Sequence, residues 1–328
     1  MTDDAMAPKN ALPTPDTRLA KSRLGWVFIG QDGLRAGWSI LLFITLVVVG
    51  TVASLTLIRS WLTNAPKTIT ADATIVTEGV QFLCLMLAAL VMRVIERRSF
   101  SHYGLGGQRP LADAAIGFAW GLVMLSILIG LLVATGSLAI DGFAVTGGPA
   151  VWSGLKWLLA FVLVGLFEEF VFRGYLQFTL ARGIAGISRA IAPGNQSAPA
   201  IGFWGAALVL SVGLFAGGHL GNSGETALGL ISVAMAGILF AYSLWRTGSL
   251  WWAIGFHASW DWAQSFLYGV SDSGLSAQGR LLNSHAVGNP LLSGGTVGPE
   301  GSILLVPVLI ASIVVVRMTL PQRASVAA

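Results

Sequence analysis

Long apolar runs separated by short polar connections dominate this chain of 328 residues. Eight of the runs approach the roughly 20 residues that a helix needs to cross a bilayer. They are continuous rather than alternating, which favours helices over the strands of an outer-membrane barrel. The pattern predicts eight membrane-spanning helices, over residues 37–60, 74–95, 114–138, 152–176, 201–219, 226–245, 250–270 and 302–320.

The composition agrees with a membrane protein, since 55% of the residues are hydrophobic, only 10% are charged, and the mean hydropathy is +0.76. A soluble domain carries about 25% charged residues and so has more polar surface. The predicted fold class is all-α, a polytopic membrane protein. We expect a polar cytoplasmic tail over residues 1–34 and one transmembrane helical domain over residues 35–328.

The net charge of +4 does not indicate a nucleic-acid partner, because the basic residues lie mostly at the ends of apolar runs. With the N-terminus placed in the cytoplasm, 15 of the 19 Lys and Arg residues fall in cytoplasmic segments. The positive-inside rule therefore predicts that both termini face the cytoplasm. We expect a multi-pass protein of a bacterial inner (plasma) membrane. The outer loop over residues 271–301 is rich in Gly and Ser, and we expect it to be mobile.

Adjacent carboxylates interrupt the fourth apolar run, where the sequence reads Glu168-Glu169-x-x-x-Arg173. Each charge at membrane depth costs about 2.5–3.5 kcal/mol on insertion scales, so retained charges suggest function. Glu169 and Arg173 are four residues apart in the orientation that favours an ion pair. Glu168 lies about 100° around the helix and is free to act as a general base. A purely structural Glu–Arg pair is the alternative interpretation.

Two histidines interrupt later runs, in the patterns Phe215-x-x-x-His219 and His257-x-x-x-Asp261. Alone, His219 could cap a helix end, and His257 could bond Asp261 merely to hold helices together. The 257–261 spacing also places both side chains on one helix face, where they could share a metal ion or a water molecule. With the glutamates and the arginine, these groups suffice for metal-assisted or carboxylate-activated hydrolysis.

Together, the three patterns resemble the CPBP family of intramembrane proteases, which includes type II CAAX prenyl endopeptidases and bacteriocin-processing and immunity proteins. Its motifs are EExxxR, FxxxH and HxxxN or HxxxD. The flanking strings FEEFVFRGYLQ and RTGSLWWAIGFHASWD resemble the family as well. The resemblance covers about a third of the chain and places the protease core at about residues 150–270.

The resemblance implies a role for each motif residue. Glu168 would be the base that activates water, and Glu169 and Arg173 would support it. His219 and His257 would be metal ligands or would stabilise the oxyanion.

Asp261 stands where many family members, notably the CAAX endopeptidases, have asparagine. The resemblance therefore implies a protease more firmly than it implies a CAAX substrate.

The cofactor expected from these residues is one divalent metal, which would be zinc. If His219, His257 and Glu168 are the protein ligands, a fourth position is left for water, as in catalytic zinc sites. The alternative is a metal-free site in which Glu168 activates water and the histidines stabilise the oxyanion.

The predicted function is hydrolysis of a peptide bond in a membrane-associated peptide or protein by an intramembrane endopeptidase. Intramembrane Glu, His and Arg also form the proton relays of transporters, so a proton-coupled transporter is one rival. A catalytically silent immunity or peptide-binding protein is another.

Straight spans would place His219 near the outer end of span five, whereas Glu168 and His257 lie toward the cytoplasmic half. The single-site interpretation therefore requires span five to be short, tilted or broken. Gly213, Gly217 and Gly218 favour such a distortion.

Overall fold

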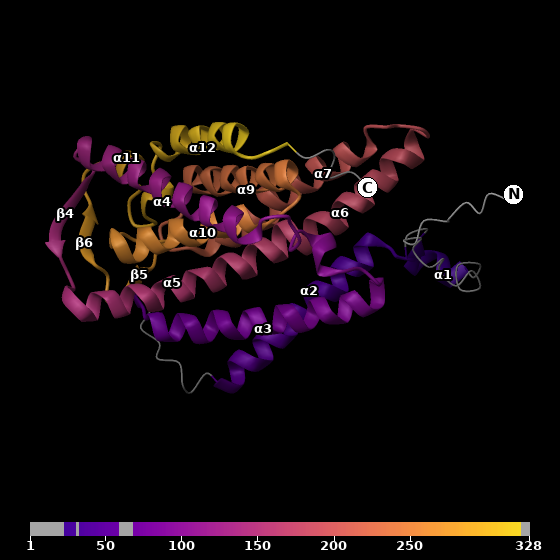
Figure 1. Ribbon diagram of the computed structural model, residues 1–328, viewed down its shortest axis with the longest axis horizontal. Helices are drawn as coiled ribbons and strands as arrows, with labels where there is room; N and C mark the ends of the chain where they lie inside the picture. Colours follow the sequence, from indigo (N-terminus) through magenta and orange to yellow (C-terminus); the bar gives the residue numbers. More distant parts are fainter. Residues whose placement is uncertain (1–22, 31–32, 59–67, 323–328) are drawn as a thin grey trace, which may run out of the picture.

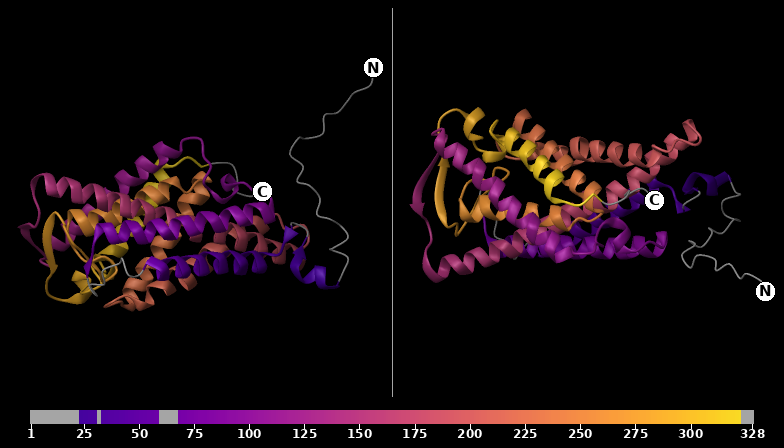
Figure 2. Two further views of the ribbon diagram at one scale, coloured as in Figure 1. Left: turned by 90° about the horizontal axis from the view of Figure 1, so that it is seen from below. Right: turned by 45° about the horizontal axis from the view of Figure 1, so that its top comes forward.

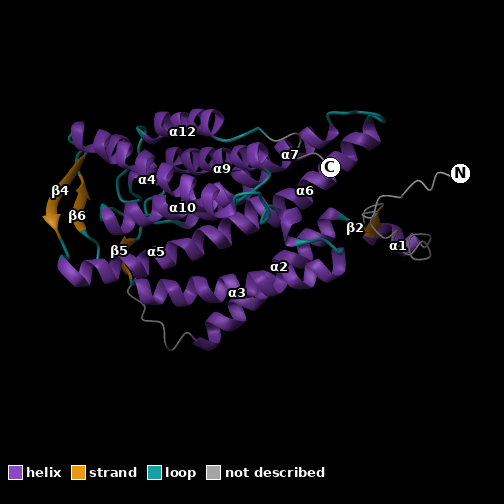
Figure 3. Ribbon diagram, viewed as in Figure 1, coloured by secondary structure: helices purple, strands orange, loops and turns teal. Residues whose placement is uncertain are grey.

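The computed structural model describes residues 23–30, 33–58 and 68–322. In these residues the chain is mostly helical, and its long helices run along the longest dimension of the molecule (Figures 1 and 3). The α-helices are α1 (Arg23–Phe28), α2 (Ala36–Ile58), α3 (Ala71–Glu96), α4 (Pro110–Ala134), α5 (Gly147–Glu169), α6 (Gln177–Ile191), α7 (Ala198–Leu208), α8 (Ala216–Gly218), α9 (Ala227–Thr247), α10 (Trp251–Trp262), α11 (Pro290–Ser293) and α12 (Leu305–Thr319).

Tighter and wider helical turns connect or extend several of these helices. The 3₁₀-helices are η2 (Phe100–Tyr103), η5 (His219–Gly221) and η7 (Pro299–Gly301). The π-helices are η3 (Phe170–Leu176), η4 (Val209–Phe215) and η6 (Ala263–Leu267). The short strands are β1 (Ile29–Gly30), β2 (Gly33–Leu34), β3 (Thr68–Ile69), β4 (Leu138–Phe143), β5 (Ser276–Ala277) and β6 (Leu282–Ala286).

Six helical segments of the described chain are long and apolar enough to cross a membrane, which indicates a multi-pass membrane protein. They are Ala36–Leu57, Ala71–Glu96, Pro110–Ala134, Gly147–Ile191, Ala198–Gly221 and Ala227–Thr247. The other two predicted spans correspond to shorter helices. One is α10 with 12 residues, continued by the five-residue η6, and the other is α12 with 15 residues. Most of the predicted polar tail lies outside the described residues.

The helix that contains the fourth predicted span is longer than that span, because it continues from Gly147 to Ile191, over 45 residues. The end of the membrane-spanning part at residue 176 stays a prediction. At a rise of about 1.5 Å per residue the segment is about 68 Å long, more than twice a bilayer's hydrocarbon core. Helix α6 is less apolar than α5 and is amphipathic, with Gln177, Thr179 and Ala185 buried and the residues from 189 to 191 exposed.

Helix α10 occupies the centre of the bundle, and nine of its 12 residues are buried. By contrast, only 11% of the most hydrophobic window of α2 is buried in the protein. Helix α10 begins three residues after Gly248, and the π-helix η6 follows it directly. Its 12 residues are too few to span a bilayer alone. Other helices surround α10, so the unpaired backbone N–H and C=O groups at its ends need not face lipid.

Glycines let α4 approach the backbone of α10 closely. A Cβ added to Gly117 would overlap the Trp252 carbonyl oxygen, and one on Gly121 would overlap the Phe256 carbonyl oxygen. In return, a Cβ on Gly255 would overlap the Ala114 carbonyl oxygen. Small residues at such spacing allow tight helix packing in membranes, where no hydrophobic effect drives helices together. These contacts fix the position of α10, which carries His257 and Asp261.

Strands β4 and β6 close one end of the bundle, opposite the end where α1 lies (Figure 2). They pair antiparallel from Leu138↔Ala286 to Phe143↔Leu282, with an irregularity between Ile140 and Gly142. The loop over residues 271–301 carries β5, β6, α11 and η7. The loop thus contains short elements of secondary structure, and its expected mobility stays a prediction.

The α4–α10 contact predicts that Gly121→Ala lowers stability, because the added methyl group must displace the α10 backbone. Overpacking of this kind costs about 1–3 kcal/mol. Gly130→Ala on the same helix is the control, since a Cβ there meets nothing within 4 Å. Thermal unfolding of the purified protein in detergent should show a loss for Gly121→Ala and none for Gly130→Ala. Equal melting temperatures would contradict the close packing.

Candidate active site

Glu169 connects two of the three motifs through a single carboxylate oxygen. Its Oε1 accepts hydrogen bonds from Arg173 Nη1 at 3.0 Å and from His257 Nδ1 at 3.0 Å. Both the glutamate and the arginine are buried, with side-chain exposures of 0% and 2%. The predicted Glu169–Arg173 ion pair is therefore present. Because the same oxygen receives His257, the pair also orients that imidazole.

His257 lies among three carboxylates, so its two ring nitrogens have different surroundings. Nδ1 donates to Glu169, which leaves Nε2 directed toward the other two acids. Nε2 is 3.5 Å from Asp261 Oδ2 and 3.8 Å from Glu168 Oε2. These separations are too long for strong direct hydrogen bonds. A water molecule or a substrate group between them would be within reach of all three side chains.

Glu168 differs from Glu169 in its access to solvent, since 29% of its side chain is exposed and none of the Glu169 side chain is. The two neighbours face different directions because adjacent helix positions differ by about 100°. Glu169 pairs with Arg173 and His257, whereas the one ion contact of Glu168 within the described residues is the long one to His257. The spacing predicted the Glu169–Arg173 pair, and the role of Glu168 as a base stays a prediction.

The second motif reaches the first through aromatic contacts. The Arg173 guanidinium lies 3.9 Å from the centre of the Phe215 ring and 5.3 Å from that of Phe240. Phe240 in turn stacks on the imidazole of His257, with ring centres 5.5 Å apart. Cation–π contacts of this kind strengthen in a desolvated site. Phe240 was missed in the sequence, because one aromatic residue in an apolar run carries no motif signal.

His219 presents a free ring nitrogen, because its Nδ1 lies 2.8 Å from the Phe215 carbonyl oxygen and can donate to it. In that tautomer Nε2 carries a lone pair. His219, His257 and Asp261 line a single cavity of about 80 Å³, together with apolar side chains from α9, α10 and α12. Glu168 lies beside this cavity, with its Oε2 atom 3.8 Å from Nε2 of His257.

The long fourth helix explains why His219 reaches the level of the other motifs. Helices α6 and α7 form a hairpin, and a Cβ on Gly202 would lie 2.9 Å from the Ala185 side chain. Glu168 is 23 residues before the end of α6, and His219 is 21 residues after the start of α7. The two positions thus differ by only about 3 Å along the bundle axis at 1.5 Å per residue.

Each of the three motifs adjoins a π-helical segment. The EExxxR motif runs into η3, the FxxxH motif begins at the last residue of η4, and the HxxxD motif is followed by η6. π-Helices make up well under 1% of residues in proteins and occur often at functional sites. The wider turn changes the direction of the side chains around it. Span five is therefore distorted, as the single-site interpretation required.

The described residues contain no group of three or more His, Cys, Asp or Glu side chains arranged to hold a metal ion. His219, His257 and Glu168 therefore do not form a ready zinc-binding set in this geometry. The zinc site remains a prediction, and the reaction proposed below uses only the side chains of the chain itself.

Comparison with known families places the motifs in one domain. Residues 150–263 match the family model described as type II CAAX prenyl endopeptidase Rce1-like. This segment is an Rce1-like domain of the CAAX endopeptidase family. The match runs from α5 to the beginning of η6 and includes all three motifs. Members of the family are intramembrane proteases. No curated protein and no solved structure matches the chain.

The buried ion pair predicts that Arg173→Met severely destabilises the protein, because Glu169 would remain buried without its cation. Breaking one side of a buried pair costs about 3–5 kcal/mol. The control is Lys156→Met, because Lys156 pairs with an Asp72 side chain that is 73% exposed. A surface pair contributes at most about 1 kcal/mol. Thermal unfolding in detergent measures both, and a wild-type melting temperature for Arg173→Met would contradict the assignment.

Proposed function

We propose that this protein is an endopeptidase that hydrolyses a peptide bond within the membrane with water activated by Glu168. The observation that carries the proposal is the placement of His257, which contacts Glu168, Glu169 and Asp261 and shares one cavity with His219. An imidazole oriented by a buried carboxylate and facing a second, accessible carboxylate is a common arrangement for acid–base chemistry.

In the proposed reaction, Glu168 accepts a proton from water as the resulting hydroxide attacks the carbonyl carbon of the substrate. The carbonyl oxygen becomes negatively charged and is stabilised by an Nε2–H group of His219 or His257, which that histidine has when both of its ring nitrogens are protonated. The C–N bond then breaks, and the proton held by Glu168 passes to the leaving nitrogen. Glu169 and Arg173 keep the His257 ring in place throughout.

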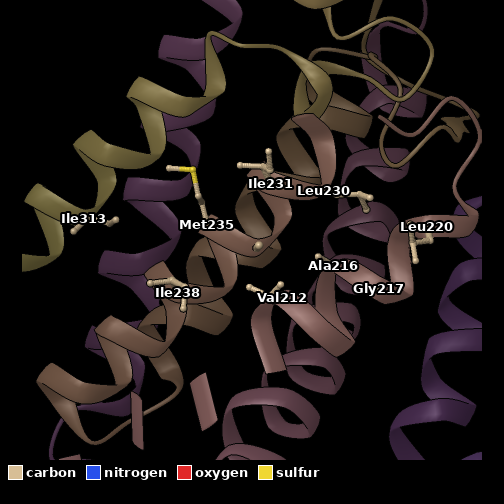
Figure 4. A pocket seen from close by; sticks show the side chains of 10 residues that line it. Val212, Ala216, Gly217, Leu220, Leu230, Ile231, Met235, Ile238 and Ile313 are labelled. Atoms are coloured by element: carbon tan, nitrogen blue, oxygen red, sulfur yellow. The ribbon is translucent and has the colours of Figure 1, made fainter. Parts of the chain in front are cut away.

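A substrate embedded in or attached to the bilayer fits the surroundings of the cavity. An apolar groove of about 610 Å³ lies between the η4–α8 segment, α9 and α12 (Figure 4). On α12, Leu305 and Leu309 line the cavity while Ile313 lines the groove, one turn further along the same face. The groove therefore adjoins the cavity and can receive the apolar part of such a substrate.

The proposed reaction predicts that substituting Glu168 and substituting Glu169 have different effects. Glu168→Gln keeps the size of the side chain but cannot accept the proton, so cleavage should be lost with little change in melting temperature. Glu169→Gln should instead lower the melting temperature, since that carboxylate is buried in the ion pair. Cleavage assays on purified proteins, paired with thermal unfolding, measure both effects. Cleavage by purified Glu168→Gln protein would refute the role of Glu168.

The substrate can be sought by comparing the N- and C-termini of membrane proteins between wild-type cells and Glu168→Ala cells. A terminus that is present only with the wild-type enzyme identifies a cleavage product. Such a result would separate a protease from a proton-coupled transporter and from a silent peptide-binding or immunity protein. An identical set of termini would favour one of these rivals.

We also propose eight membrane crossings with both termini in the cytoplasm of a bacterial inner membrane, on the basis of the basic residues. Reporter fusions at the N-terminus, near Gln108 and at the C-terminus should then report the cytoplasm. A fusion near Asn283, in β6, should report the outside. An external C-terminus would show that α10 or α12 does not complete a crossing.

A further inference from the structure

Two polar side chains from outside the three motifs line the cavity. Ser232 comes from α9 and Glu300 from η7, whereas the other lining residues outside the motifs are apolar or aromatic. Glu300 is 39 residues beyond Asp261 and lies outside the segment that matches the protease family. Neither residue is used by the reaction proposed above, so each requires its own explanation.

Glu300 is held in place by a residue with an uncommon backbone conformation. The backbone N–H and the hydroxyl of Ser273 donate to Glu300 Oε2 at 3.1 and 3.3 Å. Ser273 has φ +50°, and among the described residues only one other non-glycine residue, Arg97 at the end of α3, has positive φ. Left-handed conformations of this kind occur at sites where the surrounding structure tolerates strain for a function.

The loop around Glu300 is tightly packed, which keeps the carboxyl at the cavity. A Cβ on Gly298 would overlap the Ser271 carbonyl oxygen. Asp272 accepts a hydrogen bond from Ser265 at 2.9 Å and bonds the carboxyl group of Glu300. Burial raises the pKa of both Asp272 and Glu300, and a hydrogen bond between two carboxyl groups requires a proton on one of them.

Glu300 forms no ion pair with any Lys or Arg in the described part of the chain. Glu300 is half-buried, and enclosed acids that serve only the fold are normally paired with a cation. The proton shared with Asp272 lies in the bond between the two carboxyl groups, so toward the cavity Glu300 offers an oxygen that accepts. It therefore suits the N–H group of a peptide unit, whereas the hydroxyl of a serine can donate to the C=O group.

Ser232 has a hydroxyl group without a hydrogen-bond partner among the described residues, although the residue is only 1% exposed. Other buried serines in helices have partners: Ser243 donates to the Phe240 carbonyl oxygen at 2.8 Å, and Ser39 donates to Glu96 at 2.7 Å. Leaving a buried hydroxyl unsatisfied costs about 1–3 kcal/mol. The cavity is the space from which a partner for Ser232 can come.

We propose that Ser232 and Glu300 form a substrate-binding wall that hydrogen-bonds the main chain of the peptide next to the bond that is cleaved. The inference rests on the proposed function and specifies its substrate class. The bound segment must be extended, because a helix already uses its own N–H and C=O groups internally. The substrate is thus a locally unwound peptide, not an intact transmembrane helix.

The test measures binding of a fluorescent farnesylated peptide that ends in the Cys-aliphatic-aliphatic-X sequence for which the family is named. All proteins are full-length, purified in detergent, and carry Glu168→Gln so that the probe stays intact. Ser232→Ala and Glu300→Gln should each weaken binding about fivefold to tenfold, as expected for the loss of one hydrogen bond. A probe N-methylated around the scissile bond should bind all variants equally weakly.

Ser243→Ala is the matched control, because it removes a buried serine hydroxyl from the same helix and should leave binding unchanged. Ser232→Ala should melt at or above the temperature of its parent, since no existing hydrogen bond is lost, which separates recognition from folding. If the parent binds the probe no more tightly than the Ser232→Ala/Glu300→Gln double variant does, the inference is wrong. Cleavage of the same probe by the protein with Glu168 intact tests the proposed function separately.

Discussion

The Oε1 atom of Glu169 is the point on which the site depends, because it receives both Arg173 and His257 in a buried environment. A charge in such surroundings is expensive unless it is paired and hydrogen-bonded. Pairing Glu169 with an arginine one turn away makes its burial tolerable. The second hydrogen bond ties α10 to the fourth helix and directs the other nitrogen of His257 toward Glu168 and Asp261. The neighbouring carboxylate, Glu168, is thereby left available for chemistry.

The backbone around this cluster is adapted to bring polar groups together inside an apolar bundle. Glycines at 117, 121 and 255 let α4 and α10 touch through their main chains. π-Helical segments beside all three motifs widen the turns from which the side chains project. Arg173 is enclosed by the rings of Phe215 and Phe240, so aromatic faces supply part of the stabilisation that water gives to a guanidinium elsewhere.

The cavity has two kinds of neighbour, which under the proposed function would receive the apolar part and the peptide part of the substrate. The apolar groove suits hydrocarbon and lies beside α12, whereas Ser232 and Glu300 add polar groups to the cavity itself. The folded loop over residues 271–301 is therefore part of the site and not merely a connection. Its residues lie outside the segment that matches the family.

The sequence by itself was enough to predict a multi-pass helical membrane protein, the three motifs and the Glu169–Arg173 pair. These features depend on local hydropathy and on the spacing of residues within one helix. Only the tertiary structure decided that His219 is level with Glu168, because that depends on where the amphipathic α6 ends. It also decided that α10 is a short, enclosed helix and that Glu300 reaches the cavity. Contacts between segments far apart in the chain leave no periodic signal in either segment, so no pattern of hydrophobic and polar positions could have shown them.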